Sequence, residues 1–157
     1  LGVCNGCQML SQIKEIIPGG AHWPRFLPNR SEQFEARLVM AEILDSPSVL
    51  LAGMQSMRAP LVVAHGEGRI DFADSSNGVC LRYIDNRGQP ARYYPHNPNG
   101  SPDGATGVTT TDGRITILMP HPERVYLTQQ FSWLPPDWRH AESPWFGIFW
   151  NARRFVV

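Results

Sequence analysis

The 157-residue sequence predicts an α/β domain built on a mixed sheet with helices packed against it. Three features predict this class. The chain opens with an apolar strand, a tight turn and a helix. Strand patterns with hairpin turns follow through its middle, and a second helical pattern closes it. A chain of this length can bury a sizeable core, so one domain is expected.

The composition excludes several classes of protein. Lys plus Arg and Asp plus Glu number 14 each, so neither a nucleic-acid partner nor a membrane surface is indicated. Hydrophobic residues make up 42% of the chain, which argues against disorder despite its 14 Gly and 14 Pro. No apolar run is long enough to cross a bilayer. The three cysteines are an odd number, and a reduced, cytoplasmic setting is predicted.

The opening residues 2–8, Gly-Val-Cys-Asn-Gly-Cys-Gln, match the layout of a nucleophile elbow, with Cys4 in the place that serine takes in G-x-S-x-G. Glycines on either side let the strand and helix backbones approach closely. A thiol at a helix N-terminus lies near free N–H groups and the positive end of the helix dipole, and both favour the nucleophilic thiolate. The alternatives are a buried cysteine beside a Gly-rich turn, or a thioredoxin-like redox pair of Cys4 and Cys7.

The first half of the chain alternates between helix, loop and strand. Apolar residues at helical spacing predict a helix over residues 5–17, which Pro-Gly-Gly at 18–20 ends. Its predicted apolar face consists of Met9, Leu10, Ile13, Ile16 and Ile17. A loop is predicted over residues 21–31, followed by strands over residues 34–43, 59–64 and 70–72.

The second half predicts two hairpins and a helix. Residues 79–84 and 91–94 would pair around the turn at 85–88, and residues 107–111 and 114–119 around an Asp-Gly turn at 112–113. A C-terminal helix over residues 145–155 is expected, with Ser143 as its N-cap and Pro144 as its first residue.

A second chemical motif, Pro-His-Pro-Glu-Arg, directly follows the strand at 114–119. In extended backbone, residues i and i+2 face the same way, so Glu123 can hydrogen-bond one nitrogen of His121 while the other faces the Cys4 thiol. The carboxyl end of a strand is also where α/β folds bind ligands. The alternative is a loop histidine paired with a surface glutamate. Cys4, His121 and Glu123 are therefore candidates for a Cys-His-Glu triad.

Five motifs occur in an order that resembles the triad-type glutamine amidotransferases, in particular the glutaminase domain of phosphoribosylformylglycinamidine synthase. They are the elbow at 2–8, Phe-Glu-Ala-Arg at 34–37, His-Gly-Glu-Gly-Arg at 65–69, Asn-Pro-Asn-Gly-Ser at 97–101 and Met-Pro-His-Pro-Glu-Arg-Val at 119–125. The aromatic tail at 143–153 is similar to the C-terminus of the large single-chain form. The resemblance covers essentially the whole chain, which is shorter than these domains between positions 74 and 79.

The resemblance implies a three-layer α/β/α, flavodoxin-like fold with a mixed sheet. Because the chain starts at the elbow, residues 1–157 are expected to be the C-terminal portion of a glutaminase domain whose N-terminal half is missing. An exposed sheet edge beside residues 1–3 is then expected.

For the site, the resemblance implies that Cys4 attacks the side-chain amide of glutamine, His121 relays the proton and Glu123 fixes its tautomer. The backbone N–H of Asn5 would supply an oxyanion-hole donor. Three further side chains, those of Gln8, His65 and Asn97, are expected to bind substrate. For Gln8 the alternative is an ordinary helix-surface residue, and for the loops of His65 and Asn97 a packing or interface role.

The implied partners are glutamine and a synthetase domain of the same polypeptide. ATP and Mg²⁺ belong to that carbon–nitrogen ligase domain, because no phosphate-binding loop occurs in this sequence. No metal site or cofactor is expected in residues 1–157, and this segment alone is expected to be inactive. The alternatives are a non-catalytic docking module and another hydrolase with the same triad.

Overall fold

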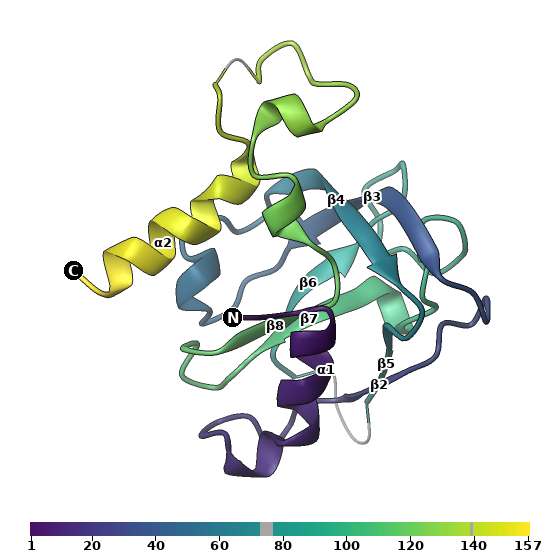
Figure 1. The fold of residues 1–157 in the computed structure, drawn as a ribbon, viewed down its shortest axis with the longest axis vertical. Coiled ribbons are helices and arrows are strands. Elements are labelled where there is room, and N and C mark those ends of the chain that lie inside the picture. Colours follow the sequence, from purple (N-terminus) through teal and green to yellow (C-terminus); the bar gives the residue numbers. More distant parts are fainter. Residues whose placement is uncertain (73–76, 139) are drawn as a thin grey trace.

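A computed structural model describes residues 1–72, 77–138 and 140–157 of the chain. Its main element is a curled six-stranded sheet in the order β1-β8-β7-β6-β3-β4 (Figure 1). β1 pairs in parallel with β8, whereas the other neighbours are antiparallel, so the predicted mixed sheet is confirmed. The strands of this sheet are β1 (Gly2–Val3), β3 (Glu35–Ile43), β4 (Arg58–His65), β6 (Val79–Tyr83), β7 (Ala105–Thr109) and β8 (Thr116–Leu118).

The remaining elements are a small sheet and two helices. β2 (Arg25–Leu27) and β5 (Arg69–Asp71) form an antiparallel pair. The helices are α1 (Asn5–Gln12) and α2 (Gly147–Phe155). Within the described residues, neither helix has the length and apolar character needed to cross a membrane. The connection at positions 74–79, which the sequence predicts to be short, lies partly outside the described residues.

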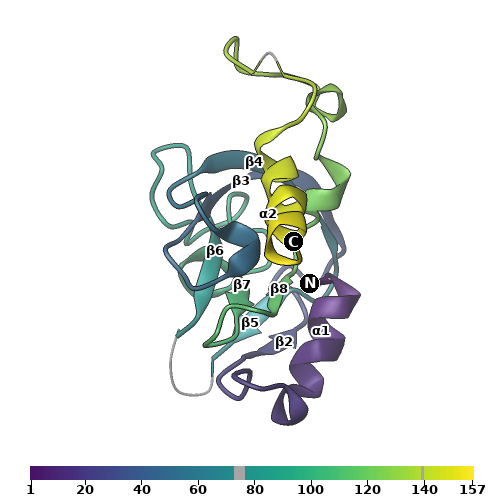
Figure 2. The same ribbon diagram turned by 90° about the vertical axis from the view of Figure 1, so that its left-hand side faces the viewer.

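In Figure 2, α2 lies above α1, and the two helices belong to core clusters on opposite faces of β8. Two consecutive residues of β8 show this, because successive side chains of a strand point to opposite faces of the sheet. Leu118 belongs to a core cluster with Ile148 of α2 and with Trp145, which shortly precedes that helix. Ile117 belongs to a second cluster with Cys7 of α1. The three-layer arrangement expected from the sequence is therefore present at this end of the sheet.

Helix α1 begins where the sequence predicts but is shorter. It ends at Gln12, and a 3-10 turn (Lys14–Ile16) follows. The predicted apolar face is wrong in part, because Met9 and Ile16 are 55% and 79% exposed while Cys7 is fully buried. A 3-10 turn has three residues per turn, so residues beyond Gln12 no longer continue the face that packs on β8.

The first predicted hairpin is wrong in its second strand. β6 has β3 on one side and β7 on the other, so it has no free edge for residues 91–94. The turn itself does form, because the Asp85 carboxylate accepts hydrogen bonds from the backbone nitrogens of Arg87 and Gln89. An isolated bridge between Ile84 and Pro90 follows it, flanked by hydrogen bonds from the Asp85 nitrogen to the Gln89 carbonyl and from the Ala91 nitrogen to the Tyr83 carbonyl.

The loop predicted over residues 21–31 is wrong in its middle, where Arg25–Leu27 form β2, whereas the other predicted helices and strands are confirmed with small shifts in their ends. β3 and β4 pair over eight residue pairs, and β7 and β8 form the second hairpin. The C-terminal helix begins as expected: the Ser143 hydroxyl accepts a hydrogen bond from the Trp145 backbone nitrogen at 3.2 Å. A 3-10 turn (Pro144–Phe146) then leads directly into α2.

The sheet curls until its two halves meet. Three strands separate β8 from β4 in the sheet order. Nevertheless His121, three positions after the end of β8, forms an antiparallel bridge with Val62 of β4. The curvature therefore carries the carboxyl end of β8 to the middle of β4.

Candidate active site

Cys4 lies at the tip of a strained turn between β1 and α1. Its backbone nitrogen donates to the Leu118 carbonyl at 2.8 Å, which continues the β1–β8 pairing up to the turn. Its φ of 53° and ψ of −112° lie where residues other than glycine are rare, at a cost of about 1–3 kcal/mol. Such strain is typical of a nucleophile elbow, which holds its side chain out from the strand–helix turn. The predicted elbow is therefore present.

The two glycines of the elbow are not equivalent, and this gives a test of its packing. A Cβ at Gly2 would lie 2.7 Å from Leu10 Cδ1 and 2.9 Å from the Gly6 carbonyl oxygen, so we expect Gly2→Ala to lower the free energy of unfolding by about 1–3 kcal/mol. Gly6→Ala is the matched control, because a Cβ there meets no atom within 4 Å. Denaturant unfolding of both variants measures the difference, and equal destabilisation would contradict the tight contact at Gly2.

His121 and Glu123 form the predicted pair. Glu123 lies in a 3-10 turn (Pro122–Arg124) that starts directly after His121. The distance from His121 Nδ1 to Glu123 Oε1 is 2.6 Å. His121 is only 6% exposed, and none of the described residues gives its Nε2 atom a hydrogen-bond partner. One imidazole nitrogen is thus held by the carboxylate, and the other has no partner among the described residues.

The strand β4 brings the cysteine and the histidine to one place. The Cys4 thiol donates to the Ala64 carbonyl oxygen at 3.8 Å. The His121 backbone nitrogen donates to the Val62 carbonyl oxygen at 2.8 Å. These two carbonyl groups belong to residues two positions apart on the same strand. Two residues that are far apart in the sequence therefore contact neighbouring positions on β4.

Asn5 and Gln8 lie beside the elbow, on a cavity of about 680 Å³ between α1 and β2. As the first residue of α1, Asn5 has a backbone N–H with no acceptor inside the helix. The Gln8 side-chain nitrogen donates to the Glu67 carbonyl oxygen at 2.7 Å, so Gln8 connects α1 to the Gly-rich loop after β4. The two residues therefore line one cavity next to the elbow, and a contact of either residue with substrate stays a prediction.

His65 is the last residue of β4 and is buried, with 3% of its surface exposed. Burial and the nearby His121 lower the pKa of His65 to about 4, so its imidazole is neutral at neutral pH. Its ring packs against Gly68: a Cβ there would lie 2.2 Å from the ring Cε1. The structure thus places His65 beside the His121 end of the site rather than on the surface.

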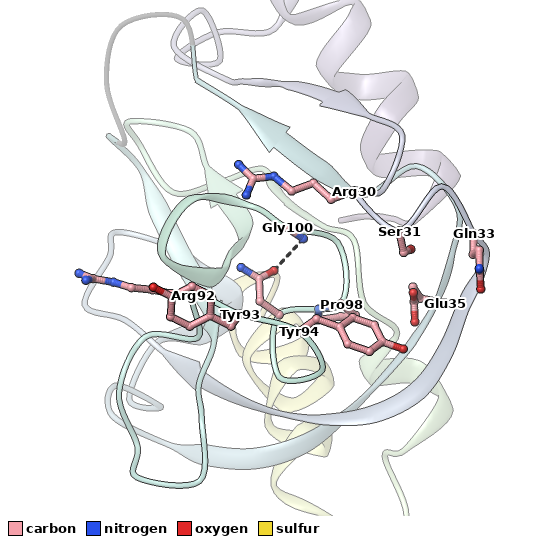
Figure 3. A pocket seen from close by; sticks show the side chains of 10 residues that line it. Arg30, Ser31, Gln33, Glu35, Arg92, Tyr93, Tyr94, Pro98 and Gly100 are labelled. Atoms are coloured by element: carbon pink, nitrogen blue, oxygen red, sulfur yellow. Dashed lines mark hydrogen bonds between the residues drawn. The ribbon is translucent and has the colours of Figure 1, made fainter.

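Asn97 serves its own loop. Its side-chain nitrogen donates to the carbonyl oxygens of Ala91 and Ser101, and its side-chain oxygen accepts from the Gly100 backbone nitrogen. The loop lines a cavity of about 400 Å³ that is separate from the Asn5 and Gln8 cavity, and Figure 3 shows Arg30 and other side chains around it. Since the amide is engaged in this way, Asn97 shapes the loop, and a direct contact with substrate stays a prediction.

Two buried asparagines that hold the loop after β4 are not among the site residues that the sequence predicts. The Asn29 side chain donates to the His65 carbonyl oxygen at 2.8 Å and accepts from the Gly68 backbone nitrogen at 3.0 Å. The Asn99 side-chain nitrogen donates to the Gly68 carbonyl oxygen at 2.7 Å. Only Asn99 lies in a motif, so the link between the motifs at 65–69 and 97–101 emerges from the structure.

Metal binding has no evident location in the part of the chain that the structure describes. No group of three or more His, Cys, Asp or Glu side chains there could hold a metal ion. The carboxylate and imidazole groups of the site instead hydrogen-bond to each other, as described for His121 and Glu123.

Fold and site together define an α/β domain that carries a cysteine on a strand–helix elbow, close to a histidine–glutamate pair. The chain belongs to the family of CobB/CobQ-like glutamine amidotransferase domains, whose family model matches residues 1–156.

Two solved structures are similar to this chain. PurLQS from Thermotoga maritima is 22% identical, with a TM-score of 0.73 over 99% of this chain and 61% of the other. A candidate GMP synthase subunit from Thermoplasma acidophilum is 10% identical, with a TM-score of 0.53 over 99% of this chain and 58% of the other. The chain thus spans about three-fifths of each, and both matches support the α/β fold.

Proposed function

We propose that this chain hydrolyses glutamine through Cys4, His121 and Glu123, as the glutaminase part of a phosphoribosylformylglycinamidine synthase. The observation that carries the proposal is the meeting of the strained Cys4 elbow and the His121–Glu123 pair at neighbouring positions of β4. Membership of the glutamine amidotransferase family supports glutamine as the substrate. The similarity to PurLQS supports the ammonia-consuming reaction, which is ATP-dependent amidine formation in purine biosynthesis.

In the first half of the reaction, the Cys4 sulfur attacks the side-chain amide carbon of glutamine. The negative charge that develops on the amide oxygen is stabilised by the backbone N–H of Asn5, which has no acceptor within α1. His121 Nε2 takes the proton of the Cys4 thiol and delivers it to the leaving nitrogen. The carbon–nitrogen bond breaks, ammonia leaves, and a γ-glutamyl thioester remains on Cys4.

Glu123 determines which nitrogen of His121 takes part. Because its carboxylate accepts a hydrogen bond from Nδ1, the proton of the neutral imidazole stays on Nδ1 and Nε2 is free to accept and donate. The carboxylate also stabilises the imidazolium that forms when Nε2 takes a proton. In the second half of the reaction, the same Nε2 activates a water molecule that hydrolyses the thioester.

Substrate recognition is assigned to the cavity beside the elbow. Gln8 uses its side-chain nitrogen to hold the Glu67 carbonyl, which leaves its side-chain oxygen for the α-amino group of glutamine. The cavity of about 680 Å³ accommodates an amino acid of this size. The ammonia passes to a synthetase domain of the same polypeptide, which would bind the ATP and Mg²⁺.

An electrophilic glutamine analogue tests the proposal on the whole protein. We expect covalent labelling of Cys4 alone, with glutamine protecting against it, because Cys7 and Cys80 are fully buried. Peptide mapping by mass spectrometry identifies the labelled cysteine. Labelling of Cys7 or Cys80 in place of Cys4 would contradict the assignment. A protein that binds a synthetase but neither reacts with the analogue nor releases ammonia from glutamine would be a docking module.

A further inference from the structure

The buried imidazole of His65 is a polar group for which the proposed triad has no use. Its side chain is almost completely enclosed, and neither Nδ1 nor Nε2 has a hydrogen-bond partner among residues 1–72, 77–138 and 140–157. Buried polar side-chain atoms in proteins are nearly always hydrogen-bonded, to protein or to ordered water. Two unpaired nitrogens on one buried ring therefore point to a small polar molecule as the partner.

The position of His65 relates that molecule to the reaction. The residue directly before it, Ala64, accepts the hydrogen bond of the Cys4 thiol. Val62, three positions before it, pairs with His121. His121 Nε2 is itself buried and has no partner within the described residues. The rings of His65 and His121 are close enough to interact electrostatically, so two unpaired nitrogens of His65 and one of His121 belong to neighbouring groups beside β4.

A water molecule suits this set of groups. A neutral imidazole offers one donor and one acceptor, and burial next to His121 keeps His65 neutral. A buried water typically makes about three hydrogen bonds to groups that would otherwise be unpaired. The proposed reaction requires a water in its second half, when the thioester is hydrolysed, and none in its first half.

We propose that His65 holds the water molecule that hydrolyses the γ-glutamyl thioester on Cys4. In this step the water oxygen bonds to the thioester carbon, and His121 Nε2 takes the water proton. The carbon–sulfur bond then breaks, the proton passes from His121 to the Cys4 sulfur, and glutamate leaves. His65 remains neutral throughout and acts as a positioning residue. This inference rests on the proposed glutaminase function.

The surroundings of His65 fix its ring in one orientation. Gly68 packs on the ring so closely that a Cβ would lie 2.2 Å from Cε1 and 2.5 Å from Nδ1. The loop between the two residues is held from outside by Asn29 and Asn99. A ring held in this way can place a water reproducibly, which a mobile side chain could not.

The first experiment compares His65→Leu with the wild type in the whole protein. Because kcat/KM reports the steps up to ammonia release, we expect kcat/KM for glutamine to stay within about threefold. We expect kcat to fall on the order of 100-fold, with a parallel fall in KM, because hydrolysis of the thioester becomes rate-limiting. His65→Gln, whose amide can also donate and accept, should recover part of kcat.

The accumulating intermediate gives a readout that a merely structural role would not change. Acid quenching followed by mass spectrometry should find the γ-glutamyl thioester on most Cys4 of His65→Leu during turnover, and on little of the wild type. Hydroxylamine, a strong nucleophile that needs no positioning, should restore turnover of the variant and yield γ-glutamyl hydroxamate. A matched fall of kcat and kcat/KM without accumulated thioester would overturn the proposal.

A second pair of variants leaves the imidazole in place. Gly68→Ala must displace the His65 ring and should reproduce the accumulation of thioester, whereas Gly66→Ala in the same loop should not, since a Cβ at Gly66 meets no atom within 4 Å. Equal behaviour of these two variants would contradict the role of the fixed ring. Failure of the glutaminase function itself is distinguishable, because the wild type would then neither form the thioester nor react with the glutamine analogue.

Discussion

Replacing Cys4 with alanine is expected to lower the glutamine-dependent kcat by on the order of 10⁵-fold, because the thioester can no longer form. Activity of the whole protein with added ammonia should stay within about twofold, since ammonia bypasses the glutaminase. The measurement is synthetase turnover with glutamine or with an ammonium salt as the nitrogen source. Cys80→Ala is the matched control: it removes a buried thiol from β6 and should cost stability but not glutamine-dependent activity.

The His121 and Glu123 variants refine this prediction. His121→Ala should lose nearly as much activity as Cys4→Ala, and the double variant should lose no more than either, because residues that act as one unit are not additive. Glu123→Gln keeps the size of the side chain but no longer selects the Nδ1–H tautomer, so a loss of about 100- to 10,000-fold is expected. Additive losses for Cys4 and His121 would contradict a shared mechanism.

The parts of the site that the sequence predicts are those built by local chain geometry. The elbow needs small residues around Cys4 within one strand–helix turn, and Gly2 meets that need through close contacts with Gly6 and Leu10 of the helix that follows. The His121–Glu123 hydrogen bond is likewise local and is set by a short proline-flanked turn. Motifs of this kind can be recognised because the residues that interact are close in the sequence.

What the sequence does not predict is the contact surface that joins these two parts. Ala64 and Val62 take part through their backbone carbonyl groups, and an apolar side chain carries no sign of such a role. Their contact with Cys4 and His121 depends on how far the sheet curls, which reflects the strand order. The wrong hairpin at residues 91–94 has the same origin, because β6 is already paired on both edges.

Helix α1 shows a different limit. The helical pattern of apolar residues extends to Ile17, but the buried positions of the observed helix are Cys7 and Ser11. Burial of the serine is possible because its hydroxyl donates to the Pro24 carbonyl, a partner 13 residues away. Tertiary contacts therefore decide which face is buried, and they override a periodic pattern in a helix this short.

Acid is expected to destabilise the fold through His65, by up to about 3 kcal/mol between pH 7 and pH 4. Burial, and then the nearby His121, lower the pKa of His65 to about 4, compared with 6.5 for an ordinary histidine. Glu35, which pairs with His65 across β3 and β4, acts in the opposite direction. Between pH 6.5 and pH 4 the unfolded chain binds a proton that the folded chain does not. The free energy of unfolding therefore decreases as the pH is lowered from 6.5 to 4, and it levels off below pH 4.

The pH dependence of denaturant unfolding for the wild type and for His65→Gln measures this contribution. The variant lacks the titrating imidazole, so its curve should be flatter between pH 6.5 and pH 4 by about 3 kcal/mol. His22→Gln is the control, since it removes an imidazole that bonds to the Thr109 carbonyl elsewhere in the fold. A slope unchanged by His65→Gln would mean that the folded state accommodates a charged ring at this position. A neutral His65 ring can both accept a hydrogen bond from a water near His121 and donate one to it, whereas a charged ring could only donate. The same titration therefore decides whether the ring is in the neutral form that the proposed hydrolysis step requires.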